Sequence, residues 1–360
     1  MTIVPVILAG GIGERFWPLS RSSMPKQMLR LVGNRTMAEE TLSRVHSLCS
    51  CDALPLIITS KAIAGKLKKA ISQRRKYNLI VEPKGKNTAP AVALAAAWIE
   101  KRYGDSVMMV LSADHHIYPV KEFVRASRYA IELAQSLNSL VVFGIRPSRP
   151  ETGYGYIQLG EQTGSSGAIQ GFKVKQFVEK PSAKKACKYL ESGKYMWNSG
   201  MFVWRTSVIL QEFRTHMPGI YKAVQALSRK GFTKAALEKF YDECEKESID
   251  YGILEKSSNV NAVVGQFGWD DIGSWESLCR LHGQDSRGTT VTGKKIFHKE
   301  NRNSIIVNKS SLSVAAIGAS DTVLVVTDDT VLLIDRSRVG DLKRYLAEMK
   351  KEGSLPPNLF

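Results

Sequence analysis

Glycines and widely spaced basic side chains near the N-terminus form a pattern suited to phosphate chemistry. Gly10, Gly11 and Gly13 follow an apolar run and lack Cβ atoms, so the backbone can adopt positive φ angles and direct its N–H groups at a ligand. Arg15 and Lys26 supply positive charge on either side. Arginine offers a planar fork that matches phosphate oxygens, whereas lysine offers a compact, mobile charge. The spacing therefore predicts a strand that leads into a phosphate-holding loop.

Acidic side chains far from this loop could bind a divalent cation. Asp114 comes two residues after the apolar run 107–112, at the end of an expected buried strand, where a carboxylate costs free energy unless a cation meets it. Asp270 and Asp271 are adjacent acids, a pairing that also needs a cation or hydrogen bonds. Mg²⁺ prefers carboxylate and phosphate oxygens and keeps several waters, so one or two aspartates plus a nucleotide are enough to hold it. We therefore expect a magnesium ion at Asp114.

Two familiar phosphate-binding motifs are not matched. The dinucleotide fingerprint needs a third glycine, but the sixth position counted from Gly11 is Phe16. Residues 288–295 (GTTVTGKK) approach a P-loop, yet they end in Lys295 rather than in the Ser or Thr that would bind magnesium. We therefore expect neither a nicotinamide cofactor nor a P-loop.

The chain is strongly basic. Its 360 residues include 51 Lys and Arg against 34 Asp and Glu, a net charge of +17. This balance favours an anionic partner such as a nucleotide, a sugar phosphate, a nucleic acid or a membrane surface, although a solvated basic surface would explain it equally well. The basic cluster at 66–76 lacks the interleaved aromatic residues that stack on bases, so we expect no nucleic-acid partner.

Cysteine usage and hydropathy indicate the compartment. The five cysteines are odd in number and scattered, which favours a reducing environment. The longest run without polar residues, 89–99, is too short to span a bilayer, and the N-terminus lacks a targeting pattern. We expect a soluble cytoplasmic protein with no membrane association.

Strand-like and helix-like segments alternate through the first half of the chain, which predicts an α/β fold with a Rossmann-like, mostly parallel sheet between helices. The expected strands are 56–59, 79–81, 107–112 and 140–144, and the expected helices are 37–47, 62–75, 91–102 and 120–136. Thr88 is the expected N-cap of the third helix. Ligands bind beyond the carboxyl ends of strands in such sheets, where the glycine loop and Asp114 fall.

The composition changes after Gly283. Short apolar runs at 304–308, 313–317, 323–327 and 331–334 read as strands, and a closing helix follows at 338–350. We therefore expect two domains, a large one at 1–282 and a small β domain with a terminal helix at 283–360.

The stretch from Leu8 to Gln27, LAGGIGERFWPLSRSSMPKQ, resembles the signature of the sugar-1-phosphate nucleotidylyltransferases. Its WPLSR and PKQ portions are similar to the mannose-1-phosphate guanylyltransferases. Six later stretches match in the expected order: EPKGKNTAP (82–90), GYGYI (153–157), FVEKP (177–181), WNSGMF (197–202), SIDYGILEK (248–256) and WDDIGSW (269–275). The resemblance implies a GT-A-like nucleotidyltransferase domain followed by a partial left-handed β-helix.

The resemblance also implies a reaction. GMP would pass from GTP to α-D-mannose 1-phosphate, giving GDP-mannose and pyrophosphate, with Mg²⁺ as cofactor and no protein nucleophile. Arg15, Lys26, Asp114 and Asp271 would be catalytic, and the two aspartates would share the magnesium ion. Asp270 would be a supporting neighbour.

The same resemblance implies the binding residues. Nucleotide contacts would come from Leu8, Gly10, Gly11, Gly13, Arg15, Glu82, Asn87 and Thr88. Sugar-phosphate contacts would come from Gly153, Glu179, Lys180 and Asn198. Imidazole suits zinc better than magnesium, so His115 and His116 are expected to be loop or sugar-side residues. We predict no role for Asp250 from the sequence.

Two alternatives stay open. One keeps the fold with another nucleoside triphosphate and hexose 1-phosphate, as in uridylyl or thymidylyl transferases acting on glucose 1-phosphate. The other is a non-catalytic regulatory subunit, which would be expected to lose one of the four catalytic residues; all four are present. The β-helix of the family often mediates oligomer contacts, which suggests a homodimer. Some relatives continue into a phosphomannose isomerase domain, and because the chain ends at Phe360 we expect no isomerase activity.

Overall fold

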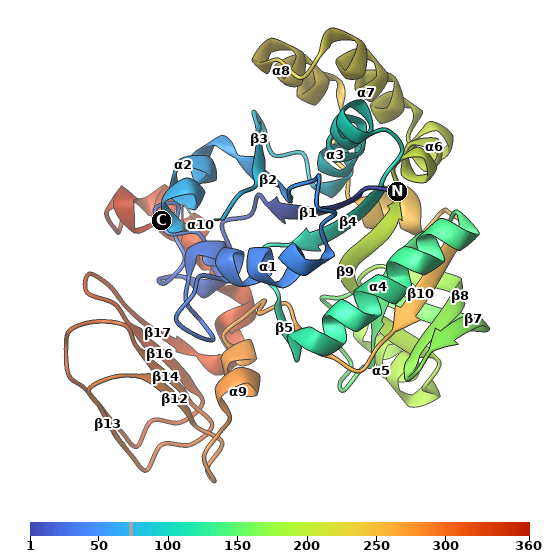
Figure 1. Cartoon of the computed structure of the whole chain (residues 1–360). Coiled ribbons are helices and arrows are strands. Elements are labelled where there is room, and N and C mark those ends of the chain that lie inside the picture. The colour runs from blue at the N-terminus through green and yellow to red at the C-terminus, as the bar shows by residue number, and fades with distance from the viewer. Residues whose placement is uncertain (72–74) are drawn as a thin grey trace.

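A nine-stranded sheet forms the centre of the computed structural model, which describes residues 1–71 and 75–360 (Figure 1). The strand order is β3-β2-β1-β4-β9-β6-β10-β8-β7. The strands are β1 (Ile3–Ala9), β2 (Leu56–Ser60), β3 (Asn78–Glu82), β4 (Val107–Ser112), β6 (Leu140–Ile145), β7 (Tyr156–Ser166), β8 (Ile169–Val178), β9 (Tyr195–Arg205) and β10 (Val260–Val264). Only β8 and β9 run against the other seven, so the predicted mostly parallel α/β fold is confirmed.

The central strands are apolar along nearly their whole length because both faces of the sheet are covered. The residues of β4 from Val107 to Leu111 are fully buried, and β1 pairs with it in parallel so that Val6 lies beside Val110. Strands buried on both faces read as continuous hydrophobic runs rather than as alternating ones. This is why β1, β2 and β4 could be recognised from the sequence.

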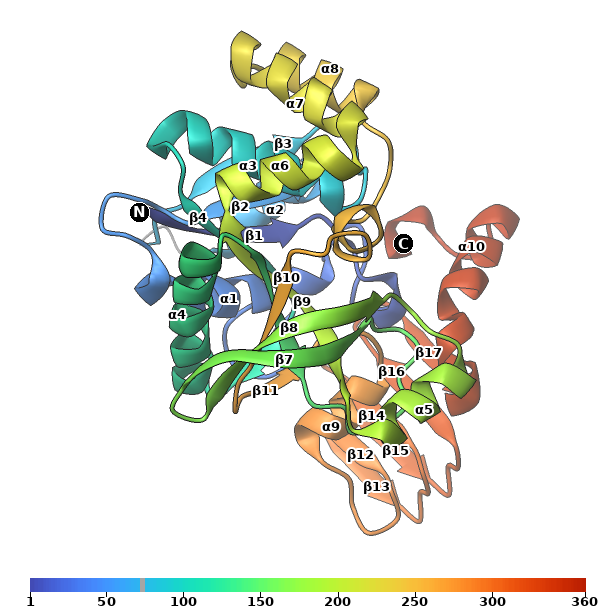
Figure 2. The same ribbon diagram turned by 90° about the vertical axis from the view of Figure 1, so that its right-hand side faces the viewer.

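Helices cover the sheet in two layers (Figure 2). One layer contains α1 (Met37–Val45), α2 (Lys61–Ala70) and α4 (Val120–Leu137), whose apolar faces join one core. The opposite layer contains α3 (Thr88–Tyr103), α6 (Thr206–His216) and α7 (Pro218–Lys230), with α8 (Lys234–Glu243) packed on α7. The short helix α5 (Ala183–Ser192) follows β8 and ends at Gly193 in the left-handed region. Each layer buries one apolar helix face against the sheet.

Two details of the predicted helices were wrong. Thr88 is the first residue of α3 rather than its cap, because Asn87 occupies the N-cap position with φ 69° and its Oδ1 accepts a hydrogen bond from the Thr88 N–H. The segment predicted as a helix over 62–75 is helical only to Ala70, and residues 72–74 lie outside the described part of the chain.

The C-terminal residues coil into small sheets beside the large one (Figure 2). The strands are β12 (Thr290–Gly293), β13 (Ile296–Lys299), β14 (Ile305–Asn308), β15 (Val314–Ile317), β16 (Thr322–Val326) and β17 (Val331–Asp335). Strands β12, β14 and β16 pair in parallel, as do β13 and β15, so successive strands alternate between two sheets as in a β-helix. The flanking helices are α9 (Glu276–His282) and α10 (Leu342–Glu352).

The small domain shares its core with the glycine-loop region. Phe16 and Trp17 are buried in one cluster with Ile305 and Val323. The indole N–H of Trp17 also donates to the Leu359 carbonyl at 2.6 Å. The C-terminal residues thus pack against the segment between Arg15 and Lys26. The domain boundary predicted at residue 282 stays a prediction.

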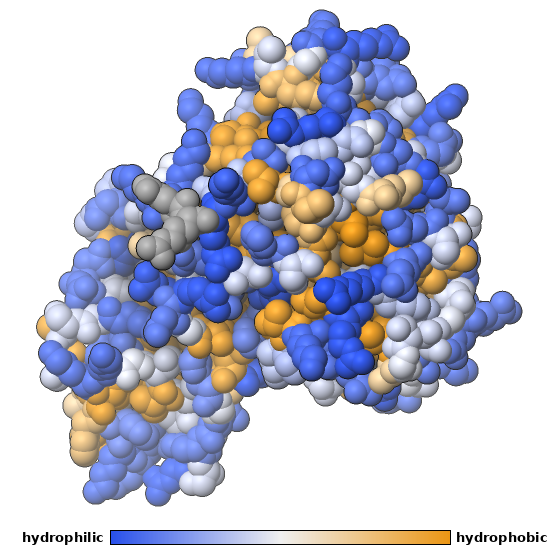
Figure 3. Space-filling model, in the orientation of Figure 1, coloured by the Kyte–Doolittle hydropathy of each residue, from blue (hydrophilic) through white to orange (hydrophobic). Residues whose placement is uncertain are grey.

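The outer surface is largely polar. Figure 3 shows mostly hydrophilic residues on one face, with hydrophobic residues in scattered patches. In the ranges 1–71 and 75–360, no helix is both long enough and apolar enough to cross a membrane. All five cysteines have free thiols in the structure.

Candidate functional site

The glycine loop and Lys26 fit against each other closely. Gly13 has φ 79°, and a Cβ atom at this position would overlap the Lys26 Cβ. Any other residue would therefore be strained in its backbone and would also push Lys26 away. The Lys26 N–H donates to the Ile12 carbonyl at 2.9 Å, which fixes the lysine to the loop. Glycine at position 13 thus allows Lys26 to lie beside the end of the loop.

The Lys26 ammonium lies between the two aspartates that were predicted to bind metal. Its Nζ donates to Asp114 Oδ2 at 2.7 Å and to the Asp271 carbonyl oxygen at 2.7 Å. Burial opposes ionisation of Asp114, but the Lys26 ammonium holds the pKa of this carboxyl below its ordinary value. Lys26 is nearly fully buried, so water screens its charge little and the ammonium is held in a defined position. A phosphate at this place would meet a positioned cation.

A short antiparallel ribbon explains how residues 114 and 271 meet. Strand β5 (His116–Tyr118) pairs with β11 (Gly268–Asp270), so that His116 lies opposite Asp270. Asp114 precedes one strand of this ribbon, and Asp271 follows the other. The Trp269 indole N–H also donates to His115 Nδ1 at 3.2 Å, and burial lowers the pKa of His115, which suits a neutral acceptor. The ribbon brings the two loops to one edge of the sheet.

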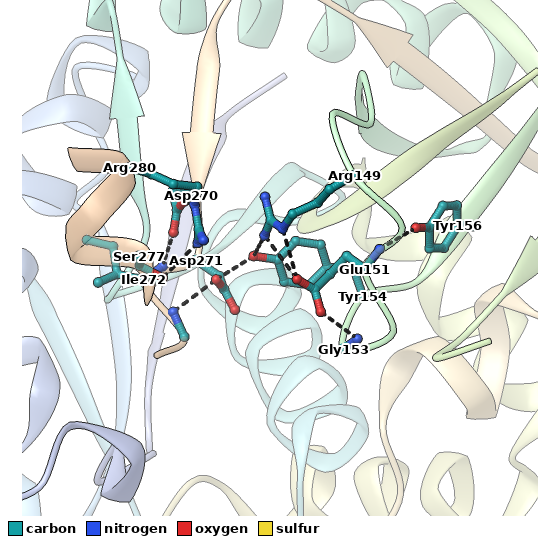
Figure 4. Close-up of polar contacts among 11 residues, drawn as sticks. Arg149, Glu151, Gly153, Tyr154, Tyr156, Asp270, Asp271, Ile272, Ser277 and Arg280 are labelled. Atoms are coloured by element: carbon teal, nitrogen blue, oxygen red, sulfur yellow. Dashed lines mark hydrogen bonds and ion pairs between the residues drawn. The ribbon is translucent and has the colours of Figure 1, made fainter. Parts of the chain in front are cut away.

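The adjacent acids have different environments (Figure 4). Asp270 accepts hydrogen bonds from the Ile272 N–H at 2.8 Å and from Arg280 Nε at 2.5 Å. Asp271 Oδ1 accepts from the Tyr154 hydroxyl at 2.6 Å and from the Gly273 N–H at 3.0 Å. Asp270 is therefore fully engaged in holding the loop, whereas Asp271 keeps an oxygen for a ligand.

The donor set suits a hard divalent cation. Within residues 1–71 and 75–360, no three His, Cys, Asp or Glu side chains are grouped so that they could hold a metal ion by themselves. Lys26 Nζ donates to the Asp114 carboxylate and to the backbone carbonyl of Asp271, so these two aspartates belong to one neighbourhood. Mg²⁺ is commonly held by one or two carboxylates together with substrate phosphates and water. The residues present fit such an ion when a nucleotide supplies the other oxygens.

The base-side residues predicted after β3 lie against a segment far along the chain. Glu82 is buried and accepts a hydrogen bond from the Tyr241 hydroxyl at 2.7 Å, and burial raises the pKa of this carboxyl. A Cβ atom on Gly10 would lie 3.4 Å from Glu82 Oε2, so the glycine loop passes beside Glu82. Thr88 Oγ1 accepts from the Ile249 N–H at 2.9 Å. Of the predicted nucleotide residues, Gly10 and Glu82 thus lie beside each other, and Thr88 is fixed to the segment that contains Ile249.

The sugar-side residues form a second group. Lys180 Nζ donates to Glu179 Oε1 at 2.6 Å; burial opposes the lysine charge, but this bond raises the pKa of Lys180 above its ordinary value. The Asn198 N–H donates to the Gly155 carbonyl at 2.8 Å. A Cβ atom on Gly155 would lie 2.5 Å from Glu179 Oε2. Gly155 therefore packs against Glu179, whereas Gly153 is exposed and its N–H donates to Glu151 Oε1 at 3.0 Å.

Asp250 belongs to the sugar-side group, although no role could be assigned to it from its place in the sequence. Asn198 Nδ2 donates to Asp250 Oδ1 at 2.9 Å. Burial, and then the neighbouring Glu179 carboxylate, raise the pKa of Asp250 to about 7. It opens a single turn of π-helix, Asp250–Leu254, a local form that is frequent at functional sites.

The structure leaves some predicted residues at the rim. Arg15, Gly11 and Gly153 are exposed, and Leu8, next to the last residue of β1, is half-buried. Sequence reasoning overlooked Tyr154 and Tyr241, which bond to Asp271 and Glu82. Tyr154 lies within the GYGYI stretch and could have been noticed there. Tyr241 lies on a helix with no motif, so no local signal marks it.

The chain is similar to known proteins over nearly its whole length. Residues 4–288 match the family described as nucleotidyl transferase. The chain is 39% identical over 361 residues to a mannose-1-phosphate guanylyltransferase of Escherichia coli strain K12, covering 98% of this chain and 74% of that protein. It is 38% identical over 355 residues to a mannose-1-phosphate guanylyltransferase of Klebsiella pneumoniae, covering 97% and 74%.

The fold of this chain superposes on a solved structure along nearly its whole length. The crystal structure of a protein named mannose-1-phosphate geranyltransferase, from Thermus thermophilus, superposes with a TM-score of 0.86 at 32% identity. The match covers 97% of this chain and 100% of that one. The family resemblance read from the sequence is thereby confirmed. The chain belongs to the nucleotidyl transferase family, and its near relatives there are mannose-1-phosphate guanylyltransferases.

Proposed function

We propose that the chain transfers GMP from GTP to α-D-mannose 1-phosphate, forming GDP-mannose and releasing pyrophosphate. The observation that carries this proposal is the near full-length similarity to mannose-1-phosphate guanylyltransferases, in a chain that keeps Lys26 between Asp114 and Asp271. A phosphate oxygen of mannose 1-phosphate attacks the α-phosphorus of GTP in line with the departing pyrophosphate. The bond from the α-phosphorus to the bridging oxygen breaks, and that oxygen leaves with pyrophosphate.

Side chains of this chain orient the two substrates and stabilise charge. The loop from Gly10 to Gly13 and Arg15 bind the triphosphate, and Lys26 stabilises the negative charge that develops at the α-phosphate. Glu82, Asn87 and Thr88 contact the nucleotide on the base side. The sugar phosphate binds at Glu179, Lys180 and Asn198, with Gly153 at the edge of this group. Holding both reactants in line supplies much of the rate enhancement.

Nucleotidyltransferases of this kind generally use a divalent metal ion. We assign Mg²⁺ to this chain, with Asp114 and Asp271 as its protein ligands. When bound, the ion would neutralise charge on the phosphate oxygens.

We extend the proposal to the partners, the compartment and the oligomeric state of the enzyme. GTP and mannose 1-phosphate are its partners, it needs no nucleic acid or membrane, and it works in the cytoplasm as a homodimer. Light scattering coupled to size exclusion would test the dimer, since a single species of 39.9 kDa would contradict it.

Pyrophosphate release across a matrix of substrates tests the activity. GTP, UTP, dTTP and ATP are each combined with mannose 1-phosphate and with glucose 1-phosphate. GTP with mannose 1-phosphate should give a kcat/KM at least about tenfold above every other pair, since binding differences of about 1.4 kcal/mol already have this effect. A higher value for UTP or dTTP with glucose 1-phosphate would favour the related transferases, and no release with any pair would favour a non-catalytic subunit.

A further inference from the structure

Tyr154 connects the sugar-side loop to a predicted metal ligand. Its hydroxyl donates to Asp271 Oδ1 at 2.6 Å, and the two residues are 117 positions apart (Figure 4). A hydrogen bond to a carboxylate is charge-assisted and stronger than one between neutral groups.

The Tyr154 ring is held on several sides. It meets the Trp197 ring edge to face at 5.3 Å between centroids and the Trp269 ring at 5.1 Å. The Arg149 guanidinium lies 5.8 Å from its centroid and 4.9 Å from that of Trp197. The next residue, Gly155, is fixed to β9 by its carbonyl oxygen. Aromatic and cation–π contacts of this kind restrict the ring, so the hydroxyl has a defined position.

The bond from Tyr154 engages one oxygen of Asp271 and leaves the other available. Oδ1 also accepts the Gly273 N–H at 3.0 Å, whereas Oδ2 accepts no hydrogen bond within the ranges 1–71 and 75–360. A Cβ atom at position 273 would lie 2.5 Å from Oδ2. Glycine there keeps the space beside this oxygen open. The carboxylate is thus fixed by two donors on one side and has its second oxygen free on the other.

We propose that Tyr154 is a positioning residue that orients the Asp271 carboxylate for a divalent metal ion. This inference rests on the proposed function, because it takes Asp271 as a metal ligand. Tyr154 touches neither the metal nor the reacting atoms; it acts through Asp271. Hydrogen-bond partners of metal ligands contribute strongly to metal affinity, and their loss typically weakens binding about 10–100-fold.

The test compares two tyrosines that are close in the sequence, Tyr154 just before β7 and Tyr156 at its start. Tyr154→Phe removes the hydroxyl and keeps the ring. Tyr156→Phe is the matched control, because the Tyr156 hydroxyl accepts the Glu151 N–H at 3.0 Å and makes no bond to Asp271. Binding of Mn²⁺ is measured by electron paramagnetic resonance with each protein saturated with GTP and without sugar phosphate, so no transfer occurs. Wild type, both variants and Asp271→Asn are compared.

Tyr154→Phe should weaken Mn²⁺ binding about 10–100-fold, and Tyr156→Phe should leave it within about threefold of wild type, inside the usual scatter of such effects. In the Asp271→Asn background, Tyr154→Phe should have no further effect, because the two residues act as one unit. The KM for mannose 1-phosphate should stay nearly unchanged. Unchanged Mn²⁺ affinity in Tyr154→Phe, or equal losses in both tyrosine variants, would overturn the proposal.

Two further measurements keep the test decisive. Thermal unfolding shows whether each variant is folded. If Tyr154→Phe is not, 3-fluorotyrosine at position 154 keeps ring and hydroxyl but alters the donor, and it should shift Mn²⁺ affinity where the same replacement at 156 does not. Because metal binding is measured without turnover, wild-type protein that binds Mn²⁺ with GTP yet releases no pyrophosphate would refute the proposed function without deciding the role of Tyr154.

Discussion

Replacing Lys26 with methionine should remove the charge at the reacting phosphate while keeping the packing of the side chain. The aliphatic part of Lys26 lies against Gly13, and its ammonium is 5.9 Å from the centroid of the Phe16 ring. Methionine has a similar length and would fill the same space. The perturbation is therefore mainly electrostatic.

The structure sets the expected magnitudes. Nζ makes two hydrogen bonds of 2.7 Å, to Asp114 Oδ2 and to the Asp271 carbonyl, and bonds to charged groups contribute about 1.5–3 kcal/mol each. The Asp114 side chain is 31% exposed, so water replaces part of what is lost. We expect the metal-free variant to lose about 2 kcal/mol of unfolding free energy. Removing a donor aimed at developing charge should lower kcat about 10²–10³-fold.

Urea unfolding and steady-state pyrophosphate release measure the two effects, with Lys101→Met as control for an exposed lysine whose contact is to Ser228. The KM for mannose 1-phosphate should change little. Mg²⁺ with GTP should restore part of the lost stability, because the ion gives Asp114 a new partner. A loss confined to KM, or a kcat within about tenfold of wild type, would refute the role of Lys26 in the transition state.

Three further predictions concern the other charged groups. Lys180→Ala should raise the KM for mannose 1-phosphate about tenfold or more with a smaller change in kcat, since removing a charge-assisted contact costs about 1.5–3 kcal/mol; an unchanged KM would remove Lys180 from the site. Asp114→Asn and Asp271→Asn should each raise the magnesium requirement and lower kcat, and the double variant should be little worse than either; additive losses in a magnesium titration would mean that they do not share an ion. Burial raises the pKa of Asp250 from 3.8 to about 7, so the folded state retains a proton that the unfolded chain releases, and stability falls as pH rises through that interval. Asp250→Asn should therefore be stabilised relative to wild type more at pH 8 than at pH 5 in urea titrations; equal differences at both pH values would contradict the raised pKa.

The family and the overall fold could be predicted from the sequence because both leave local sequence patterns. The apolar runs of β1, β2 and β4 are continuous, since those strands are buried on both faces. The glycine loop can be recognised because glycines recur at the positions where the backbone must approach a ligand closely. Each of these features lies within one short, continuous stretch of the sequence.

Contacts that join distant segments could not be read in the same way. Strands β5 and β11 contain three residues each, too few to show a hydropathy period, yet their pairing brings Asp114 and Asp271 to one place. The bond from Tyr154 to Asp271 and the one from Tyr241 to Glu82 depend on the finished fold. At residue 87, a positive φ angle let asparagine take the cap position that threonine was expected to fill.

Transfer of a labelled phosphate tests the central claim most directly. Enzyme is mixed in a single turnover with GTP carrying ³²P at the α position, together with magnesium and mannose 1-phosphate, and the reaction is stopped in acid at successive times. The proposed in-line attack predicts that the label passes straight from GTP to GDP-mannose, with none bound to the protein at any time. Label on acid-precipitated protein during the turnover, or no labelled GDP-mannose at all, would contradict the account.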